Sequence, residues 1–177
     1  MGNFLNSDYD NPDAGIAVTG ISTGLEFTYR FKENFEASLL ALYTRNGLDE
    51  TSINYAVSSV HPNASLSMSG WDLIWVMSGA GYTSYILPAI TFYAKGNIGI
   101  MGGYAPDITE TISTVSHTKK AGSAIAFAYG LGFGFTDDER VDVGVRLYAT
   151  RPNFTKGAAE NSIQQIILLQ FMVGYIW

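Results

Sequence analysis

The stretch that decides the fold is Ser162–Trp177, which reads SIQQIILLQFMVGYIW. One of its two alternating sets is almost wholly apolar and ends in two aromatic residues: Ile163, Gln165, Ile167, Leu169, Phe171, Val173, Tyr175 and Trp177. The other set is mixed and includes Gln164, Gln170 and Gly174. A period of two indicates a β-strand, and the stretch is longer than usual strands of globular proteins. Such a strand aggregates when exposed to water, whereas a bilayer-spanning strand needs one face for acyl chains and one for a lumen.

The amino-acid composition leaves two classes of protein open. The chain has 177 residues, of which 47% are hydrophobic and only 15% charged, where roughly a quarter charged is usual for a soluble domain. No run of about 18 apolar residues is present, so a transmembrane helix is not predicted. A closed membrane barrel or an unusually apolar soluble β-protein remains. The net charge of −6 argues against a nucleic-acid partner, and the lack of cysteine excludes disulfides and thiolate metal sites.

Two parts are predicted along the chain. Residues 1–14 are polar and turn-rich and are expected to form a loop or loose terminus, and residues 15–177 one transmembrane β-barrel domain. Seven segments with strand patterning are predicted to span: 15–31, 35–44, 67–83, 89–103, 124–135, 141–149 and 162–177. Short connections (32–34, 84–88, 136–139) alternate with long polar ones (46–66, 104–120, 151–161), as in outer-membrane barrels with short periplasmic turns and long extracellular loops.

These features resemble the small bacterial outer-membrane β-barrels of the OmpA-like, OmpX-like and OmpW-like class. The resemblance is one of architecture, and it includes the ending Phe171–Trp177, which is similar to the last strand that the family's assembly machinery recognises. It implies an all-β, antiparallel, up-and-down barrel in the bacterial outer membrane. Its implied partners are membrane lipid, lipopolysaccharide and the assembly machinery.

The strand count raises a problem of parity, because single-chain bacterial barrels have an even number of strands. Either the chain lacks an N-terminal strand, or another envelope protein supplies or covers that edge, or the count misses one strand. The candidate for a missed strand is 53–60, which alternates weakly. We expect seven spanning strands in this chain and eight in the closed barrel.

Seven charged residues are predicted to face the lumen: Glu26, Arg30, Glu36, Asp72, Lys95, Asp142 and Arg146. Charges inside a narrow barrel need partners, so we expect a salt-bridge plug, the alternative being a polar pore or ligand pocket whose selectivity they set. In the segment 124–135 the large residues are predicted to face outward and the Ala and Gly residues inward, which leaves room for long side chains of neighbouring strands.

Six aromatic residues are predicted to lie at the lipid interface: Trp71, Trp75, Tyr82, Tyr85, Tyr175 and Trp177. The two histidines, His61 and His117, fall in predicted loops without the sequence patterns of membrane-embedded hydrolases. No catalytic residue, metal site or cofactor is therefore predicted.

The expected function is structural or interactive: long surface loops that meet partners, or an anchor within an envelope complex. The alternatives are a narrow porin-like channel for ions or small hydrophobic solutes and, third, a lipid-modifying enzyme of the outer membrane. A soluble lipocalin-like carrier would place the apolar faces inside instead.

Overall fold

The computed structural model describes residues 3–5, 17–48, 64–112, 115–119, 122–137, 140–154, 162–163 and 165–175. Its regular structure is all β, and among the described residues no helix is long and apolar enough to cross a membrane. The strands are β1 (Asn3–Leu5), β2 (Ala17–Lys32), β3 (Phe35–Leu48), β4 (Ala64–Met68), β5 (Trp71–Leu87), β6 (Ile90–Tyr104), β7 (Ile108–Ile112), β8 (Val115–Lys119), β9 (Ser123–Asp137), β10 (Val141–Thr150), β11 (Asn153–Phe154), β12 (Ser162–Ile163) and β13 (Ile166–Tyr175).

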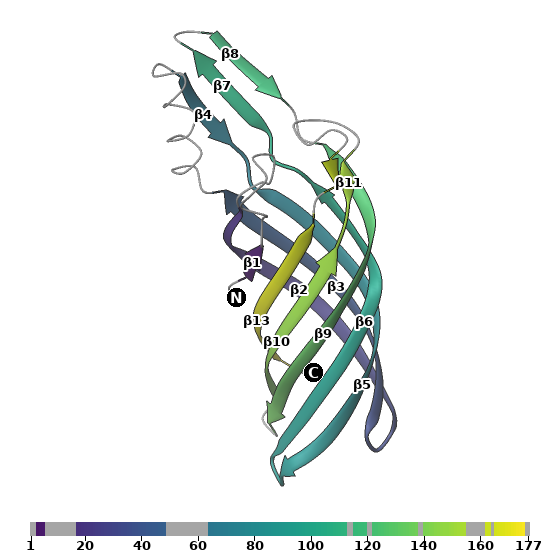
Figure 1. Cartoon of the computed structure of the whole chain (residues 1–177). Helices are drawn as coiled ribbons and strands as arrows, with labels where there is room; N and C mark the ends of the chain where they lie inside the picture. Colours follow the sequence, from purple (N-terminus) through teal and green to yellow (C-terminus); the bar gives the residue numbers. More distant parts are fainter. Residues whose placement is uncertain are drawn as a thin grey trace.

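Eight of these strands close into an antiparallel barrel in the order β1-β13-β10-β9-β6-β5-β3-β2. Within the wall each strand pairs with its neighbours along the chain, which is an up-and-down topology, and the long strands run the length of the barrel (Figure 1). At one end, which we call the turn end, residues 33–34 and 88–89 make tight connections. The seven long strands predicted from sequence are confirmed in number and order. The bounds of two of them differ, because residues 67–68 and 162–163 belong to separate sheets and β5 continues to Leu87 through the predicted turn 84–88.

The eighth position in the wall is filled by β1, which lies inside the segment 1–14 that was predicted to be a loop or loose terminus. Asn3, Phe4 and Leu5 pair with Gln170, Leu169 and Leu168 of β13, and Asn3 also pairs with Gly20 of β2. A three-residue strand carries too few alternations to be recognised by its period. The alternative strand at 53–60 lies outside the described residues.

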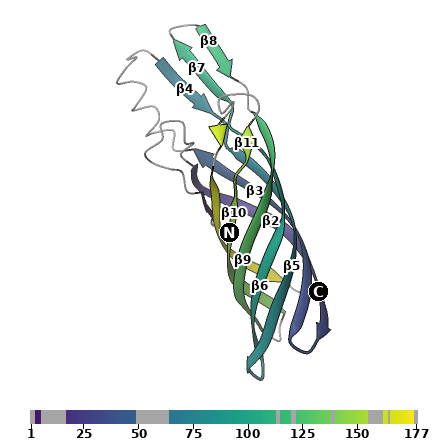
Figure 2. The same cartoon turned by 45° about the vertical axis from the view of Figure 1, so that its right-hand side comes forward.

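Beyond the opposite end of the barrel, which we call the loop end, a second sheet projects from the wall (Figure 2). In this projecting sheet β4 pairs with β7, and β7 pairs with β8. The expectation of a long loop at 104–120 is therefore wrong over most of its length. β-Branched residues dominate β7, and they favour a hairpin over irregular structure. The loop predicted at 151–161 likewise contains β11, which pairs with β12.

The outer surface of the barrel wall is apolar. On β9 the residues Phe127 and Leu131 are 61% and 55% exposed, while Ala128 is fully buried. The same alternation holds on β13, where Val173 is 62% exposed and Leu168 is buried. The faces predicted for the segments 124–135 and 162–177 are confirmed for the described residues.

The face predicted for β5 is wrong. Leu73, Trp75 and Met77 are almost completely buried in the interior, whereas Ile74 and Val76 are exposed on the outside. The run from Leu73 to Met77 is apolar at every position, so its period does not identify the outward face. The register decides it, because Asp72 pairs with Arg45 on the exposed face of β3.

Candidate functional site

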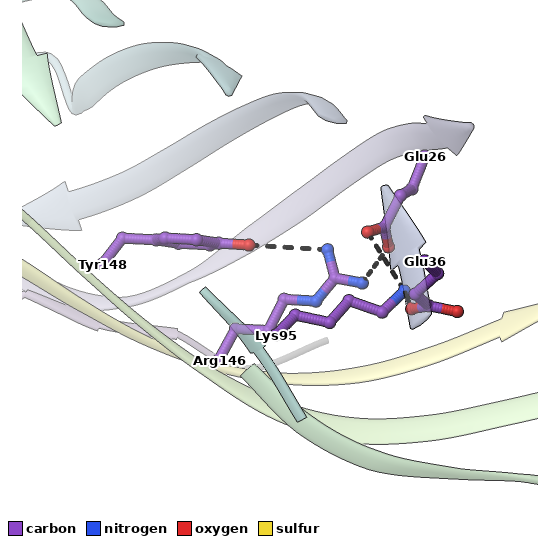
Figure 3. A network of polar contacts seen from close by, with 5 residues as sticks. All are labelled: Glu26, Glu36, Lys95, Arg146 and Tyr148. Atoms are coloured by element: carbon purple, nitrogen blue, oxygen red, sulfur yellow. Dashed lines mark hydrogen bonds and ion pairs between the residues drawn. The ribbon is translucent and has the colours of Figure 1, made fainter. Parts of the chain in front are cut away.

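The interior near the turn end holds a cluster of charged residues from four strands (Figure 3). Lys95 on β6 forms ion pairs with Glu36 on β3, at 2.7 Å, and with Glu26 on β2, at 3.3 Å. Arg146 on β10 binds the other oxygen of Glu26. Its second amino group lies 3.5 Å from the Tyr148 hydroxyl and donates to it. We call these five residues the lumen cluster.

The lumen cluster is shielded from solvent. The side chains of Lys95, Glu36 and Arg146 are 8%, 5% and 6% exposed, and Glu26 is the most accessible at 15%. Each buried cation faces at least one carboxylate, which offsets the loss of hydration that an isolated charge would suffer. The Lys95 ammonium also lies 4.7 Å from the centre of the Tyr93 ring, a distance that allows a cation–π interaction.

Glycines in the wall provide the space that the lumen cluster fills. A Cβ atom on Gly130 would lie 2.2 Å from the Tyr148 ring, and one on Gly132 would lie 3.3 Å from Cγ of Arg146. On β5, a Cβ atom on Gly81 would lie 2.8 Å from Cγ of Lys95. Small residues on β9 and β5 therefore let long side chains from the adjacent strands cross the lumen, as the alternation in the segment 124–135 predicted.

Toward the loop end the interior becomes apolar. The Trp75 ring packs against Tyr148 with 5.7 Å between ring centres, and Trp71 packs edge-on against Phe154 of β11 at 5.6 Å. Phe154 is fully buried, so the segment after β10 folds back over the mouth of the barrel. This apolar plug continues with other buried residues: Leu40, Leu42, Leu73, Met77, Met101, Ile166 and Leu168.

Of the seven charges predicted for the lumen, four meet in the lumen cluster: Glu26, Glu36, Lys95 and Arg146. Asp142 lies on the inward face of β10 and is half-buried, outside the lumen cluster. Arg30 is exposed, although its pairing partner on β3, Glu36, is buried.

The prediction that Asp72 faces the lumen is wrong. Its carboxylate accepts a hydrogen bond from the Tyr43 hydroxyl and lies 3.8 Å from Arg45, on the outer surface of the wall. The error follows from the inverted face of β5. The Arg45 and Asp72 side chains are 64% and 34% exposed, so solvent weakens this ion pair.

The six aromatic residues predicted for the lipid interface fall into a buried and an exposed group. Trp71 and Trp75 are 5% and 0% exposed inside the barrel, so their prediction as lipid-facing residues is wrong. Tyr82, Tyr85 and Tyr175 are 45%, 68% and 57% exposed on the surface. Tyr82 also contacts Phe35 edge-on at 5.6 Å. Trp177 lies outside the described residues.

The projecting sheet has two unlike faces. Hydroxyl residues occupy one face: Ser65, Ser67, Thr109, Thr111, Ser116 and Thr118. Two of its cross-strand pairs are hydrogen-bonded at 2.9 Å, Thr109 with Thr118 and Thr111 with Ser116. His117 lies on β8, opposite Glu110, and not in a loop as predicted. His61 lies outside the described residues.

Tyr148 and Tyr93 share the inward alternation of Arg146 and Lys95, so the periodicity predicts both as interior residues, although they were not among the candidate site residues. The sequence analysis missed Phe154. Phe154 follows the end of β10 and has no periodic signal. Across the described ranges, no group of three or more His, Asp or Glu side chains is placed to hold a metal ion.

Comparison with known proteins identifies a fold and no family. No family model matches the chain, and no curated protein matches it. Among solved structures, the chain is similar to the crystal structure of Neisserial surface protein A, with a TM-score of 0.50 over 97% of this chain and 88% of that one. The two sequences are 11% identical, so the likeness extends to the fold alone. The predicted fold, a small antiparallel up-and-down β-barrel, is thereby confirmed.

Proposed function

We propose that this chain is an integral β-barrel of the bacterial outer membrane whose role is structural or interactive. The observation that carries the proposal is the apolar outer surface of a closed barrel. On β9 the exposed apolar residues run from Ile125 to Phe135. Ten residue steps at about 3.4 Å, inclined at about 40°, span about 26 Å along the barrel axis. Outer-membrane barrels carry an apolar band of about 25 Å.

The filled interior supports a structural role over transport. Trp75, Tyr148 and Phe154 are fully buried across the lumen, and the charges beneath them pair with each other. A conducting pore needs a continuous polar path past these rings. The narrow channel is therefore the weaker candidate, and a lipid-modifying enzyme has no catalytic constellation among the described residues to support it.

The projecting sheet supports interaction at the surface. It extends from the loop end, beyond the apolar band, and displays the hydroxyl groups of Ser116 and Thr118 to solvent. We infer that it and the adjoining loops meet partners outside the bilayer. The apolar band contacts membrane lipid and lipopolysaccharide, and β13 is the strand that the assembly machinery would recognise.

Two measurements test the proposal. Refolded into lipid vesicles, the chain should migrate faster on a detergent gel before heating than after, as a closed barrel does. Hydrophobic photolabels in the lipid should modify Phe127 and not Ser116. Labelling of both residues alike would contradict membrane insertion.

Planar-bilayer recording separates the structural role from the channel. We expect no discrete openings from the native chain, because the apolar plug fills the lumen. Regular openings in purified preparations, with a conductance altered by Lys95→Gln, would favour the channel. Lipid mass spectrometry of membranes incubated with the protein tests the enzyme; no new lipid species is expected.

A further inference from the structure

The turn between β2 and β3 borders a hollow on the outer surface of the barrel, which we call the turn-end hollow. Its volume is about 610 Å³, and it is lined by Lys32, Glu33, Asn34, Phe35 and Tyr82. The turn lies at the end of the barrel opposite the projecting sheet (Figure 1). Sites for small organic molecules have volumes of about 300–1,000 Å³, so the hollow is large enough for a ligand of that size.

A β-bulge places Lys32 at the hollow. On β2, Tyr29 and Phe31 are exposed on the outward alternation, which by itself would turn Lys32 inward. The register between β2 and β3 shifts between Arg30 and Lys32, so Lys32 pairs with the outward residue Phe35. Residues directly opposite in an antiparallel pair have Cβ atoms about 5 Å apart. The side chain of Lys32 therefore starts beside Phe35, on the outer side of the wall.

Contacts with β5 fix the aromatic wall of the hollow. Phe35 stacks on Phe31 with 6.3 Å between ring centres and meets Tyr82 edge-on at 5.6 Å. The Asn34 side-chain amide donates a hydrogen bond of 3.0 Å to the Tyr82 hydroxyl. The Thr83 backbone N–H donates to the Asn34 carbonyl at 2.8 Å. The turn is thus tied to a third strand, and the shape of the hollow does not depend on a ligand.

The hollow offers two hydrogen-bond donors and one carboxylate to a ligand. The Tyr82 oxygen accepts from Asn34, which leaves its O–H to donate. The Lys32 ammonium carries three donors. Neither it nor the Glu33 carboxylate forms an ion pair within the part of the chain that the structure describes. By contrast, the outward cation near the other end of β3, Arg45, is paired with Asp72.

We propose that the turn-end hollow binds the headgroup of a phospholipid that carries both a phosphate and an ammonium group. This inference rests on the proposed membrane location, which places the turn end at a bilayer surface. The phosphate accepts hydrogen bonds from Lys32 and Tyr82, and the ammonium lies beside the Glu33 carboxylate. The first part of the acyl chains packs on the rings of Phe31 and Phe35, since aromatic rings settle at headgroup level.

The surroundings of Lys32 favour a lipid over a free anion. Phe31 and Phe35 are 52% and 48% exposed next to it, and a free phosphate has no apolar part to cover their rings. Lysine binds phosphate as a point charge, so the choice between headgroups depends on Glu33. A headgroup without an ammonium would bring an uncompensated polar end next to this carboxylate.

Native mass spectrometry of the refolded chain in a non-ionic detergent tests the site. The chain is mixed with phosphatidylethanolamine and with phosphatidylglycerol of the same acyl chains, which lacks the ammonium. We expect the native chain to retain phosphatidylethanolamine several-fold better. Lys32→Met should weaken this retention about tenfold and Tyr82→Phe less, and Glu33→Gln should remove the preference between the two lipids. Arg45→Met removes an outward cation far from the hollow and is the control, which should retain lipid as the native chain does.

A photoreactive phosphatidylethanolamine in vesicles provides the second measurement. With its reactive group at the start of an acyl chain, it should label Phe35, and Lys32→Met should reduce this labelling while that of Phe135 on β9 stays unchanged. Lys32, Glu33 and Tyr82 are exposed, so their variants should migrate as closed barrels on an unheated detergent gel.

Three results would overturn the proposal: equal losses in Lys32→Met and Arg45→Met, equal retention of both lipids by the native chain, or displacement of the lipid by inorganic phosphate. A chain that never enters vesicles would instead contradict the proposed function. An inserted barrel whose Lys32→Met variant binds lipid like the native chain would contradict the site alone.

Discussion

Lys95→Met is the substitution that most directly tests the lumen cluster. The Lys95 ammonium is the cation shared by Glu26 and Glu36, with N···O distances of 3.3 Å and 2.7 Å. Methionine keeps most of the side-chain volume and removes the charge. Both carboxylates then remain in the lumen, and Arg146 is placed to neutralise Glu26 alone.

The expected loss of unfolding free energy is about 3 kcal/mol. Removing one partner of a buried ion pair typically costs 3–5 kcal/mol, because the remaining charge is left without compensation. We take the lower end because Glu26 keeps its pair with Arg146 and its side chain is 15% exposed. Glu36, at 5% exposed, is the carboxylate left without a cation and accounts for most of the loss.

The assay is urea unfolding in lipid vesicles, followed by tryptophan fluorescence and by migration on a detergent gel. The double variant Lys95→Met with Glu36→Gln removes the carboxylate that Lys95→Met leaves unpaired. It should recover at least half of the lost unfolding free energy. Glu36→Gln alone should cost about 1 kcal/mol, because Lys95 still faces Glu26. A single Lys95→Met variant as stable as the native chain, or a double variant no better than the single, would refute a stabilising cluster.

Three further predictions concern the wall. Gly130→Ala should destabilise the barrel by about 1–3 kcal/mol in urea unfolding, because the new Cβ would lie 2.2 Å from the Tyr148 ring; Gly102→Ala, with no atom within 4 Å of its Cβ, is the neutral control. Phe127→Arg should cost about 2–4 kcal/mol on the lipid face, and Ser116→Arg on the projecting sheet less than about 0.5 kcal/mol; equal costs would contradict the proposed membrane orientation. Asp72→Asn should cost at most about 1 kcal/mol by the same assay, because its ion pair is exposed.

Sequence periodicity predicted the wall wherever the two faces of a strand differ in size or polarity. On β9 the alternation of Phe133 and Gly132 indicates which side faces outward, since a Cβ atom on Gly132 would already lie 3.3 Å from Cγ of Arg146. On β5 both faces are apolar between Leu73 and Met77. The prediction wrongly assigned the larger side chains to the outward face. In a narrow barrel the largest rings also belong inside, where Trp75 packs against Tyr148.

The sequence predicts which residues belong to the lumen cluster better than it predicts which of them contact each other. Inward charges must pair, so the sequence indicates that Glu26, Lys95 and Arg146 share one space. Which charges meet depends on the relative level of strands far apart in sequence, as for Glu26 and Arg146. Arg30 is exposed although Glu36, directly opposite on β3, is buried, and the alternation of β2 does not predict this difference. β1 was missed because its three residues are defined by pairing with β13 and β2, and pairing leaves no periodic signal in so short a strand.

The lumen cluster and the short strand β1 are parts of one arrangement. Along the closed order of the wall, β2 and β10 are separated by β1 and β13, so the ion pair between Glu26 and Arg146 connects, inside the barrel, the two parts of the wall that β1 joins. Lys95 extends this connection to Glu36 on β3. It follows that weakening the cluster, as Lys95→Met does, should loosen β2 before the other long strands, and amide hydrogen exchange that rises equally in β2 and β9 would contradict this order.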